Sequence, residues 1–330
     1  MMKTVYIVTG GTGFVGNNII KLLESKGDTV VAQARSETKA AIALANSDAT
    51  IVYGTVMNER DLDALFAVHG AGMRYVVIHT AAVVYLGRNR KKVKEMFDTN
   101  ISGTANVISA CLKHNARLVY VSSVHAIQEA PNRGIITEVT TFDHNRVVGT
   151  YAKSKAMASQ LVMDSIKNYN LDAVLVHPSG IVGPNDYSNT HLTQMVADYK
   201  DGKIPAATNG GYDFVDVRDV AQGTIEVANV GKRGDCFILS NKYFSVKEML
   251  DTLHELGAGK RVRLKLPLWM ARAGLPVIAL QSKLFKKRPL YTRYSLYTLG
   301  SNSNFSNQKA REELGFSPRP LRESLKDMIN

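Results

Sequence analysis

Short apolar runs alternate with longer amphipathic stretches over the first half of the chain. The runs are rich in Val, Ile and other residues that favour buried strands. Between them, apolar residues recur three and four positions apart, which is typical of helices that cover a sheet. The alternation predicts an α/β fold with a Rossmann-type, doubly wound parallel sheet and a ligand at the carboxyl ends of its strands. The predicted strands span residues 3–8, 29–34, 51–53, 74–82, 117–123 and 172–178, and the predicted helices begin near residues 17, 61, 100 and 151.

A glycine-rich turn, TGGTGFVG at residues 9–16, joins the first predicted strand to the first predicted helix. Glycines allow a tight turn and a close approach of the backbone to a pyrophosphate, whose charge faces the free N–H groups of the helix start. Any tight turn between a strand and a helix can resemble this pattern, but here both flanking elements are in the right order. We therefore expect a dinucleotide to bind at Gly10, Thr12, Gly13, Phe14, Val15 and Gly16.

Arg35 stands directly after the second predicted strand. An acidic residue at this place would bind the ribose hydroxyls of NAD, whereas an arginine suits the additional phosphate of NADP. The sequence therefore predicts NADP(H) as the preferred cofactor, with NAD(H) possible, and the alternative is an ordinary surface arginine. Small residues at the exit of the fourth strand, Thr80, Ala81 and Ala82, would let the cofactor lie close to the backbone.

The regular alternation ends at Pro178. Glycines, prolines and polar residues in 179–214 predict a binding loop region, and a capping-box pattern at 245–248 (SVKE) predicts the start of a helix. A strand at 236–239 is expected to return to the first domain. The expected domains are a dinucleotide-binding domain, residues 1–178 with 215–240, and a smaller, mostly C-terminal α/β substrate-binding domain, residues 179–214 and 241–330. Loops 84–95 and 185–213 and the segment 266–295 are expected to line the substrate pocket.

Positive charge is concentrated in the last quarter of the chain. The net charge is +12, and residues 241–330 account for +10 of it. Such a segment attracts nucleic acid, an anionic membrane surface or an anionic substrate, or is simply solvated. No nucleic-acid-binding motif is present, so we expect no nucleic-acid partner. The apolar stretch 266–284, broken by Pro267, Gly274 and Pro276, predicts a helical lid or pocket wall, with a membrane-surface helix as the alternative.

The sequence carries no recognisable targeting signal. The first strand begins almost at Met1, and no uninterrupted apolar run is long enough to cross a bilayer. Cys111 and Cys236 lie in apolar runs without metal-ligand spacing, which favours buried, reduced thiols. We therefore expect a cytoplasmic protein with no metal site and no integral membrane segment.

Tyr151 and Lys155 stand four residues apart at the start of a predicted helix and therefore share one of its faces. A phenol has a pKa of about 10, but a neighbouring ammonium favours the phenolate and lowers that pKa. Tyr151 would then serve as general base for an alcohol or as general acid for a carbonyl. Ser123, at the end of the fifth predicted strand, could hydrogen-bond the same substrate oxygen. Each residue alone has a common structural explanation, whereas their combination with the glycine turn does not.

Together these features resemble the extended branch of the short-chain dehydrogenase/reductase superfamily, over essentially the whole chain. Four segments match motifs of that branch: residues 9–16, 100–107 (NISGTANV), 177–184 (HPSGIVGP) and 214–221 (FVDVRDVA). Within the branch, Arg35, the Tyr151–Lys155 helix and the segment 178–184 make the chain most similar to the dihydroflavonol-4-reductase and 3β-hydroxysteroid dehydrogenase group.

The resemblance implies hydride transfer to or from C4 of the nicotinamide, between a carbonyl and an alcohol of an apolar small molecule. Tyr151 would move the proton, Ser123 would orient the substrate oxygen, and Lys155 would bind the nicotinamide ribose and adjust Tyr151. Asn100 would hold the helix geometry or a water. The cofactor-binding residues implied beyond the glycine turn are Arg35, Val56, Thr80, Ala81, Ala82, Tyr151, Lys155, Pro178, Ser179 and Ile181. Relatives commonly dimerise through the helices that here begin at Asn100 and Tyr151, which implies a homodimer with Cys111 near or beneath that face.

The chain departs from the family pattern in two places. Thr55 stands where many relatives carry an Asp aimed at adenine, so Val56 and backbone groups are expected to bind the adenine. His177 replaces an arginine, and its effect is unknown.

Two other functions stay open, a nucleotide-sugar epimerase of the same branch and a cofactor-binding regulatory protein. A regulatory protein would need only the glycine turn, and the complete set of Ser123, Tyr151 and Lys155 argues against it. Dehydratases of the branch place an Asp-Glu pair after the hydroxyl residue, whereas residues 124–126 here are Val, His and Ala, which argues against dehydration on chemical grounds. The Asn that epimerases carry at Ser179 or Gly180 is missing, but basic residues such as Arg218 and Arg293 could hold a diphosphate.

Overall fold

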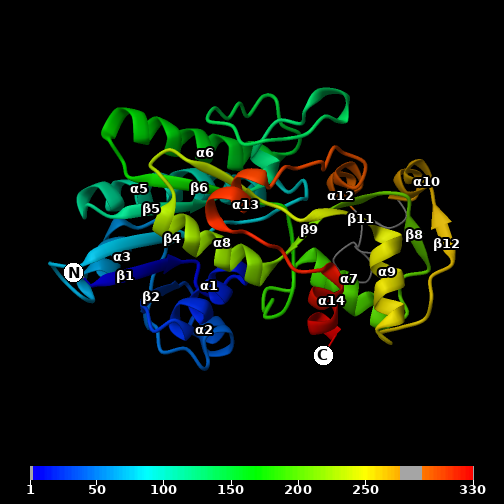
Figure 1. The fold of residues 1–330 in the computed structure, drawn as a ribbon, viewed down its shortest axis with the longest axis horizontal. Coiled ribbons are helices and arrows are strands. Elements are labelled where there is room, and N and C mark those ends of the chain that lie inside the picture. Colours follow the sequence, from blue (N-terminus) through cyan, green and yellow to red (C-terminus); the bar gives the residue numbers. More distant parts are fainter. Residues whose placement is uncertain (1–2, 276–291, 330) are drawn as a thin grey trace.

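A sheet of seven parallel strands, in the order β10-β6-β5-β4-β1-β2-β3, forms the centre of the computed structural model, which describes residues 3–275 and 292–329 (Figure 1). The order reverses between β1 and β4, and a reversal of this kind creates a crevice at the carboxyl ends of the strands. The predicted α/β class and doubly wound sheet are confirmed. The strands of this sheet are β1 (Thr4–Thr9), β2 (Thr29–Ala34), β3 (Thr50–Tyr53), β4 (Arg74–His79), β5 (Arg117–Val121), β6 (Ala173–Pro178) and β10 (Cys236–Leu239).

Two hydrophobic cores lie on the two faces of this sheet, because successive side chains of a strand point to opposite faces. Along β1, Val5 and Ile7 join one core, and Tyr6 and Val8 join the other. The first core is covered by α3, α5 and α6, and the second by α1 and α8 (Figure 1). The covering helices are α1 (Phe14–Ser25), α2 (Glu37–Ala43), α3 (Glu59–Ala67), α5 (Gly103–Lys113), α6 (Thr150–Tyr169), α8 (Val217–Val230) and α13 (Gln308–Leu314).

The helix predicted to begin at Asn100 has a more elaborate start. Helix α4 (Arg90–Phe97) begins ten residues earlier and continues through a π-helical turn, η1 (Asp98–Ser102), into α5. The three elements form one continuous helical segment. From the sequence, residues 86–94 were expected to be either a basic loop or the start of a helix, and the structure shows the helix; the two could not be told apart because α4 is short, highly charged and buries only Met96. The π turn leaves Asn100 buried at the junction, and π turns within α-helices often occur at functional sites.

A smaller part of the molecule lies beyond the carboxyl ends of the main strands (Figure 1). It contains a three-stranded sheet in the order β11-β9-β7 and a two-stranded sheet of β8 and β12. Helix α9 begins at Ser245 with both hydrogen bonds of the predicted capping box. The elements are β7 (Gly180–Val182), α7 (His191–Lys200), β8 (Ala206–Thr208), β9 (Gly211–Asp216), β11 (Lys242–Ser245), α9 (Val246–Glu255), β12 (Leu264–Leu266), α10 (Leu268–Ala273), α12 (Arg293–Thr298) and α14 (Leu321–Ile329).

Residues 179–214 were expected to be mainly loop, and this expectation was wrong. The segment contains β7, α7, β8 and most of β9. Helix α7 buries Met195, Val196 and Tyr199, a short helical stripe that the surrounding Gly, Pro and Asn residues concealed in the sequence. The predicted lid at 266–284 is described only as far as residue 275, where it forms the end of β12 and the helix α10; the rest of it lies outside the described residues.

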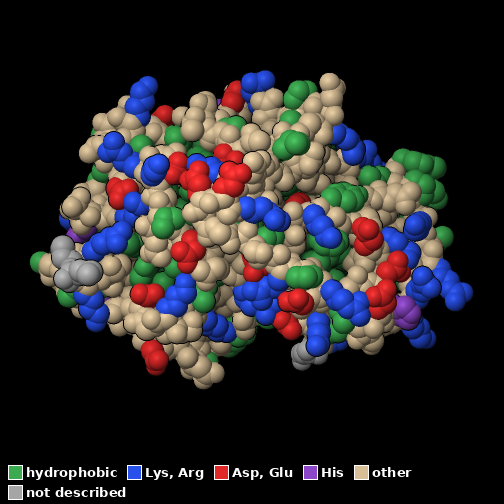
Figure 2. Space-filling view, in the orientation of Figure 1, with side chains coloured by type: hydrophobic (Ala, Val, Ile, Leu, Met, Phe, Trp, Pro, Cys, Tyr) green, Lys and Arg blue, Asp and Glu red, His purple; other side chains and the backbone are tan. Residues whose placement is uncertain are grey.

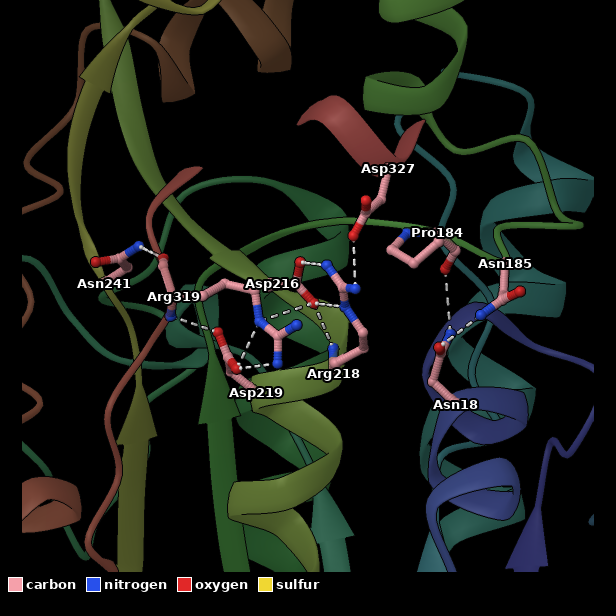
Figure 3. A network of polar contacts seen from close by, with 9 residues as sticks. All are labelled: Asn18, Pro184, Asn185, Asp216, Arg218, Asp219, Asn241, Arg319 and Asp327. Atoms are coloured by element: carbon pink, nitrogen blue, oxygen red, sulfur yellow. Dashed lines mark hydrogen bonds and ion pairs between the residues drawn. The ribbon is translucent and has the colours of Figure 1, made fainter. Parts of the chain in front are cut away.

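A network of charged side chains, centred on the buried Asp216, joins α14 to the turn between β9 and α8 (Figure 3). The Asp216 carboxylate is fully buried and accepts hydrogen bonds from the Arg218 backbone and guanidinium. Arg218 also pairs with Asp327 of α14 at 2.6 Å, and Arg319 pairs with Asp219 at 2.8 Å. These contacts raise the pKa of Arg218 and lower that of Asp216, against the effect of burial on each.

Candidate active site

The glycine turn lies at the carboxyl end of β1, directly at the reversal of strand order. Gly10 has a φ of +71°, and a Cβ atom there would lie 2.8 Å from the Ala81 backbone. A Cβ atom at Gly16 would lie 2.4 Å from the Gly10 carbonyl oxygen, so only glycine allows helix α1 to start this close to the strand. No side chain caps the start of α1, and its first turn holds no acidic residue. A cradle of this kind fits a dinucleotide pyrophosphate.

The residues expected to accompany the turn lie next to it. Thr80 donates a hydrogen bond to the Thr9 carbonyl at 2.7 Å, which holds the exit of β4 against the turn. Within the turn, Thr12, Gly13 and Val15 are half-buried and Phe14 is buried. The arrangement brings residues 10–16 and 80–82 to one site, and their role in cofactor binding stays a prediction.

The residues predicted to contact the adenosine part of the cofactor lie in different environments. Arg35 is exposed beyond β2, and none of the residues that the structure describes forms an ion pair with it. Val56 is only 3% exposed and packs against Gly103 of α5, and its carbonyl accepts a hydrogen bond from Asn106. A carboxylate does occur at this turn: Asp61 of α3 accepts a hydrogen bond from the backbone N–H of Thr55 at 2.8 Å. Asp61 could not be recognised from the sequence, because it lies six residues after Thr55, whose backbone it binds.

Pro178, Ser179 and Ile181 connect β6 to β7 beside the same crevice. Ser179 is buried, and its hydroxyl donates to Oδ1 of Asp213 on β9. The backbone N–H of Asn241 donates to the same oxygen. Burial raises the pKa of Asp213 to about 6, and these two hydrogen bonds oppose the rise. Asp213 of β9 therefore joins the segment between β6 and β7 to the start of the segment that follows β10.

The free energy of unfolding of the wild type is expected to fall as the pH rises from about 4 to about 6. In Asp213→Asn this fall should be absent. In that range the folded chain keeps a proton on Asp213 that the unfolded chain has lost, so deprotonation disfavours folding. The pKa difference corresponds to about 2–3 kcal/mol. Because both hydrogen bonds reach Oδ1, an amide oxygen preserves them. Urea unfolding of both proteins at the two ends of the range measures the effect, and parallel pH profiles would contradict it.

Ser123, Tyr151 and Lys155 come together between the end of β5 and the first turn of α6. The Ser123 hydroxyl forms a hydrogen bond with the Tyr151 phenol. Lys155 is 3% exposed, and its ammonium donates to the Val121 carbonyl at 2.8 Å and lies 4.7 Å from the centre of the Tyr120 ring. The three side chains therefore lie together at one site, and their catalytic roles stay a prediction.

The expected electrostatic coupling between Lys155 and Tyr151 is not the dominant effect. Burial raises the pKa of Tyr151 to about 12, and the hydrogen bond from Ser123 is what opposes that rise. Burial also lowers the pKa of Lys155 to about 7. Lys155 is not among the causes of the shift at Tyr151, so the lowering of this pKa expected from the ammonium is not found, and the desolvated phenol carries its proton at neutral pH.

Asn100 connects three elements of the site. Its side-chain oxygen accepts from the Val83 N–H at 2.8 Å, and its amide donates to the Val83 carbonyl and to the Ser154 hydroxyl, both at 3.0 Å. Ser154 in turn donates to the Tyr151 carbonyl. Asn100 thus joins the β4 exit to the turn of α6 that carries Tyr151. Of the two roles expected for it, this geometry supports the structural one.

A cavity of about 230 Å³ lies next to the His125 ring, and both aromatic side chains (Tyr212, Tyr297, Phe305) and polar ones (Gln128, Glu129, Arg146, Ser301, Asn302) line it. His125 stands in its wall, with ring centroids 6.2 Å from Tyr151, 5.5 Å from Tyr212 and 5.7 Å from Tyr294. Burial lowers the pKa of His125 to about 4, so the imidazole is neutral at neutral pH. Tyr212 and Tyr294 were not singled out from the sequence, although they lie in two of the segments expected to line the pocket, 185–213 and 266–295. Nothing local to either residue indicated that the fold would bring its ring to His125.

The cavity differs from the expected substrate pocket. Its other described lining comes mainly from residues 124–148 and 297–305, and of the three expected segments only 185–213 contributes, through Tyr212. Arg146 is the basic residue of this lining and stands there with Glu129. Arg218, considered as a ligand for a diphosphate, is instead held by Asp216 and Asp327. Arg293 is exposed at the start of α12.

Both cysteines are buried and unpaired, and burial raises the pKa of each thiol. Within residues 3–275 and 292–329, no group of three or more His, Cys, Asp or Glu residues is arranged to hold a metal ion. None of the helices in those ranges has the length and hydropathy needed to cross a bilayer.

A sheet of this order, with a glycine turn at its reversal point and a tyrosine and lysine one helical turn apart beside it, defines an extended short-chain dehydrogenase/reductase, an enzyme that acts on CH–OH or carbonyl groups. The family model of the NAD dependent epimerase/dehydratase family matches residues 6–238, and the chain belongs to that family.

Three comparisons place the chain within the family. It is 27% identical to sterol demethylase protein B of Methylococcus capsulatus, over 98% of this chain and 96% of the relative. It is also 27% identical to a dihydroflavonol reductase-like protein of Synechocystis, over 100% of this chain and 94% of the relative. The crystal structure of gox2253 superimposes with a TM-score of 0.83 at 30% identity and covers 98% of this chain and 96% of the other.

Proposed function

We propose that the protein is an NADPH-dependent reductase that converts a carbonyl group of an apolar small molecule to an alcohol. The observation that carries the proposal is the position of Tyr151, which lies next to Ser123 and whose ring contacts His125 in the wall of the cavity; burial there raises the pKa of the phenol to about 12, so that it keeps its proton at neutral pH. A phenol that keeps its proton at neutral pH is prepared to donate it to the oxygen of a carbonyl as hydride arrives at the carbon. When bound, the nicotinamide would supply that hydride.

Residues of the chain would orient the substrate, bind the cofactor and hold Tyr151 in position. Ser123 orients the carbonyl oxygen toward Tyr151, and the Lys155 ammonium lies on the same face of α6, where it can hold a ribose hydroxyl. Asn100 and Ser154 fix the turn that carries Tyr151. The stacked rings of His125 and Tyr212 in the cavity wall suit a ring-containing substrate, and the Gln128, Glu129 and Arg146 side chains of the same cavity could contact its polar groups. The sterol and flavonol names of the relatives are consistent with a substrate of this kind.

A nucleotide-sugar epimerase is the alternative within the same family. It would need cationic side chains for a diphosphate, and Arg218 is already paired on both sides with carboxylates. The test is the fate of the cofactor when the protein is incubated with a panel of apolar ketones and aldehydes and, separately, with nucleotide sugars. Stoichiometric loss of NADPH with a carbonyl compound is expected. Interconversion of nucleotide sugars without net cofactor change would overturn the proposal, and cofactor binding without any turnover would favour a regulatory protein.

NADPH is expected to bind about ten- to a hundredfold more tightly than NADH, because the exposed Arg35 guanidinium is available for a charge-assisted contact with the additional phosphate. Arg35→Ala should abolish most of this difference by weakening NADPH binding alone. Fluorescence titration of both cofactors measures it. Lys113→Ala, which removes a surface cation on α5 paired with Asp63, is the matched control. Equal affinities that Arg35→Ala leaves unchanged would make Arg35 a surface residue.

For the overall organisation, we propose that residues 1–178 with 215–240 bind the cofactor and that 179–214 and 241–330 bind the substrate. We also propose a homodimer formed through α5 and α6. Cys111, 1% exposed on α5, lies within the core on which these helices pack.

A further inference from the structure

One segment of the chain carries an amount of charge equal to the net charge of the whole protein. Between Glu255 and Glu312 the sequence contains twelve Lys and Arg residues and no Asp or Glu. The rest of the chain has 29 basic and 29 acidic residues and is therefore neutral. The excess positive charge of the protein is therefore confined to this one segment. A segment of this kind favours binding to an anionic partner.

The structure describes the first part of that segment as residues 260–273, which form β12 and α10. Here exposed apolar side chains lie among the cations: Leu264 is 57% exposed, Trp269 68% and Met270 43%. We call these three residues, together with the exposed cations Lys260, Arg261, Arg263, Lys265 and Arg272, the basic–apolar end. Figure 1 places β12 and α10 at the extremity of the molecule farthest from the N-terminus, and Figure 2 shows hydrophobic side chains at that extremity with Lys and Arg side chains near them.

The cations of the basic–apolar end are largely unneutralised. Among the described residues only one of the five has a carboxylate within ion-pair distance, namely Arg261, at 3.9 Å from Asp251. Asp251 already binds Lys247 of the same helix. The nearby Glu255 carboxylate forms its ion pair with Arg322 and not with a residue of the basic–apolar end. The field of the remaining four cations therefore extends into solvent, where it attracts anions over about 10 Å at moderate ionic strength.

We propose that the basic–apolar end binds reversibly to the surface of an anionic lipid bilayer. Lysine and arginine attract anionic headgroups while their alkyl stems cover apolar surface, and tryptophan favours the boundary between headgroups and acyl chains. Trp269, Met270 and Leu264 would enter that boundary, with the five cations around them at headgroup level. A nucleic acid would engage the cations and leave Met270 and Leu264 in water, so the combination favours a bilayer. The inference does not rest on the proposed enzymatic function.

The protein contains a single tryptophan, Trp269, which makes its fluorescence a direct reporter of this end. The full-length protein would be titrated with vesicles of phosphatidylcholine alone and with vesicles of equal parts phosphatidylcholine and phosphatidylglycerol. We expect a blue shift of the emission, and quenching by brominated acyl chains, with the anionic vesicles only. Added salt should reverse the binding. Co-sedimentation with vesicles without a change in Trp269 emission would mean that another surface binds, and would overturn the proposal.

Charge reversal tests the cations. Arg261→Glu/Arg263→Glu/Lys265→Glu should weaken partitioning into anionic vesicles by at least about tenfold, since each basic residue near such a surface contributes about fivefold. Lys3→Glu/Lys113→Glu/Lys232→Glu changes the net charge equally at exposed positions of the opposite end and should bind nearly as well as wild type. Equal weakening by both variants would reduce the effect to net charge and refute a specific surface. Binding to a DNA or RNA oligonucleotide with none to vesicles would assign the end to nucleic acid instead. The wild-type fluorescence decides the question even where a variant fails to fold.

Discussion

Tyr151→Phe is expected to lower turnover by about two to four orders of magnitude while leaving cofactor affinity nearly unchanged. The substitution removes one oxygen, the proton donor that Ser123 holds in place, and keeps the ring that contacts His125. Its effect should therefore lie in kcat rather than in KM, because the lost interaction is made mainly with the transition state. Initial rates of NADPH oxidation with the best carbonyl substrate, together with a cofactor titration, separate the two quantities.

Tyr294→Phe is the matched control for this substitution. Tyr294 contacts the same His125 ring, at a centroid distance of 5.7 Å, and is not positioned by Ser123. Loss of its hydroxyl should change turnover by less than about tenfold, a cost of the size of one hydrogen bond. If Tyr151→Phe kept near-full activity, or if both variants lost activity equally, Tyr151 would not be the proton donor.

The parts of the fold that depend on local sequence could be predicted. Strands β1 and β4 consist of apolar, β-branched residues whose two faces are both buried, and the glycine turn must contain glycine at positions 10 and 16 for steric reasons. The four-residue spacing of Tyr151 and Lys155 fixes their common helix face wherever that helix lies. Such features depend only on residues that are close in the sequence, so they can be predicted without the tertiary structure.

The cavity and its electrostatics could not be predicted in the same way. Tyr212 and Tyr294 reach His125 because the second sheet and α12 fold back over the main one. The pKa of Tyr151 depends on how completely the phenol is desolvated, and the spacing of Tyr151 and Lys155 suggested the opposite direction. Helix α7 was missed because its apolar stripe is only a few residues long. In each case the outcome is decided by contacts between distant segments.

Lys155→Met is expected to weaken cofactor binding and to lower turnover by at least about a hundredfold. The ammonium is a buried cation beside the Ser123–Tyr151 pair, and methionine fills its volume without the charge or the donor. Both effects should appear together, in contrast to Tyr151→Phe, which should change turnover alone. Cofactor titration and single-turnover kinetics measure them. Lys153→Met, half-exposed on the same helix, is the control and should change neither quantity.

The stability of the same variant distinguishes a functional lysine from a structural one. Burial lowers the pKa of Lys155 from 10.5 to about 7, so between these values the unfolded chain binds a proton that the folded chain lacks. Wild-type stability should therefore rise relative to Lys155→Met by about 2–3 kcal/mol between about pH 7 and pH 9.5, as urea unfolding would measure. Lys153→Met should run parallel to the wild type. If the buried Lys155 ammonium lowers stability near neutral pH and is also needed for turnover, its role is functional and not structural. A pH-independent stability difference between wild type and Lys155→Met would instead make the Lys155–Val121 hydrogen bond a structural tie.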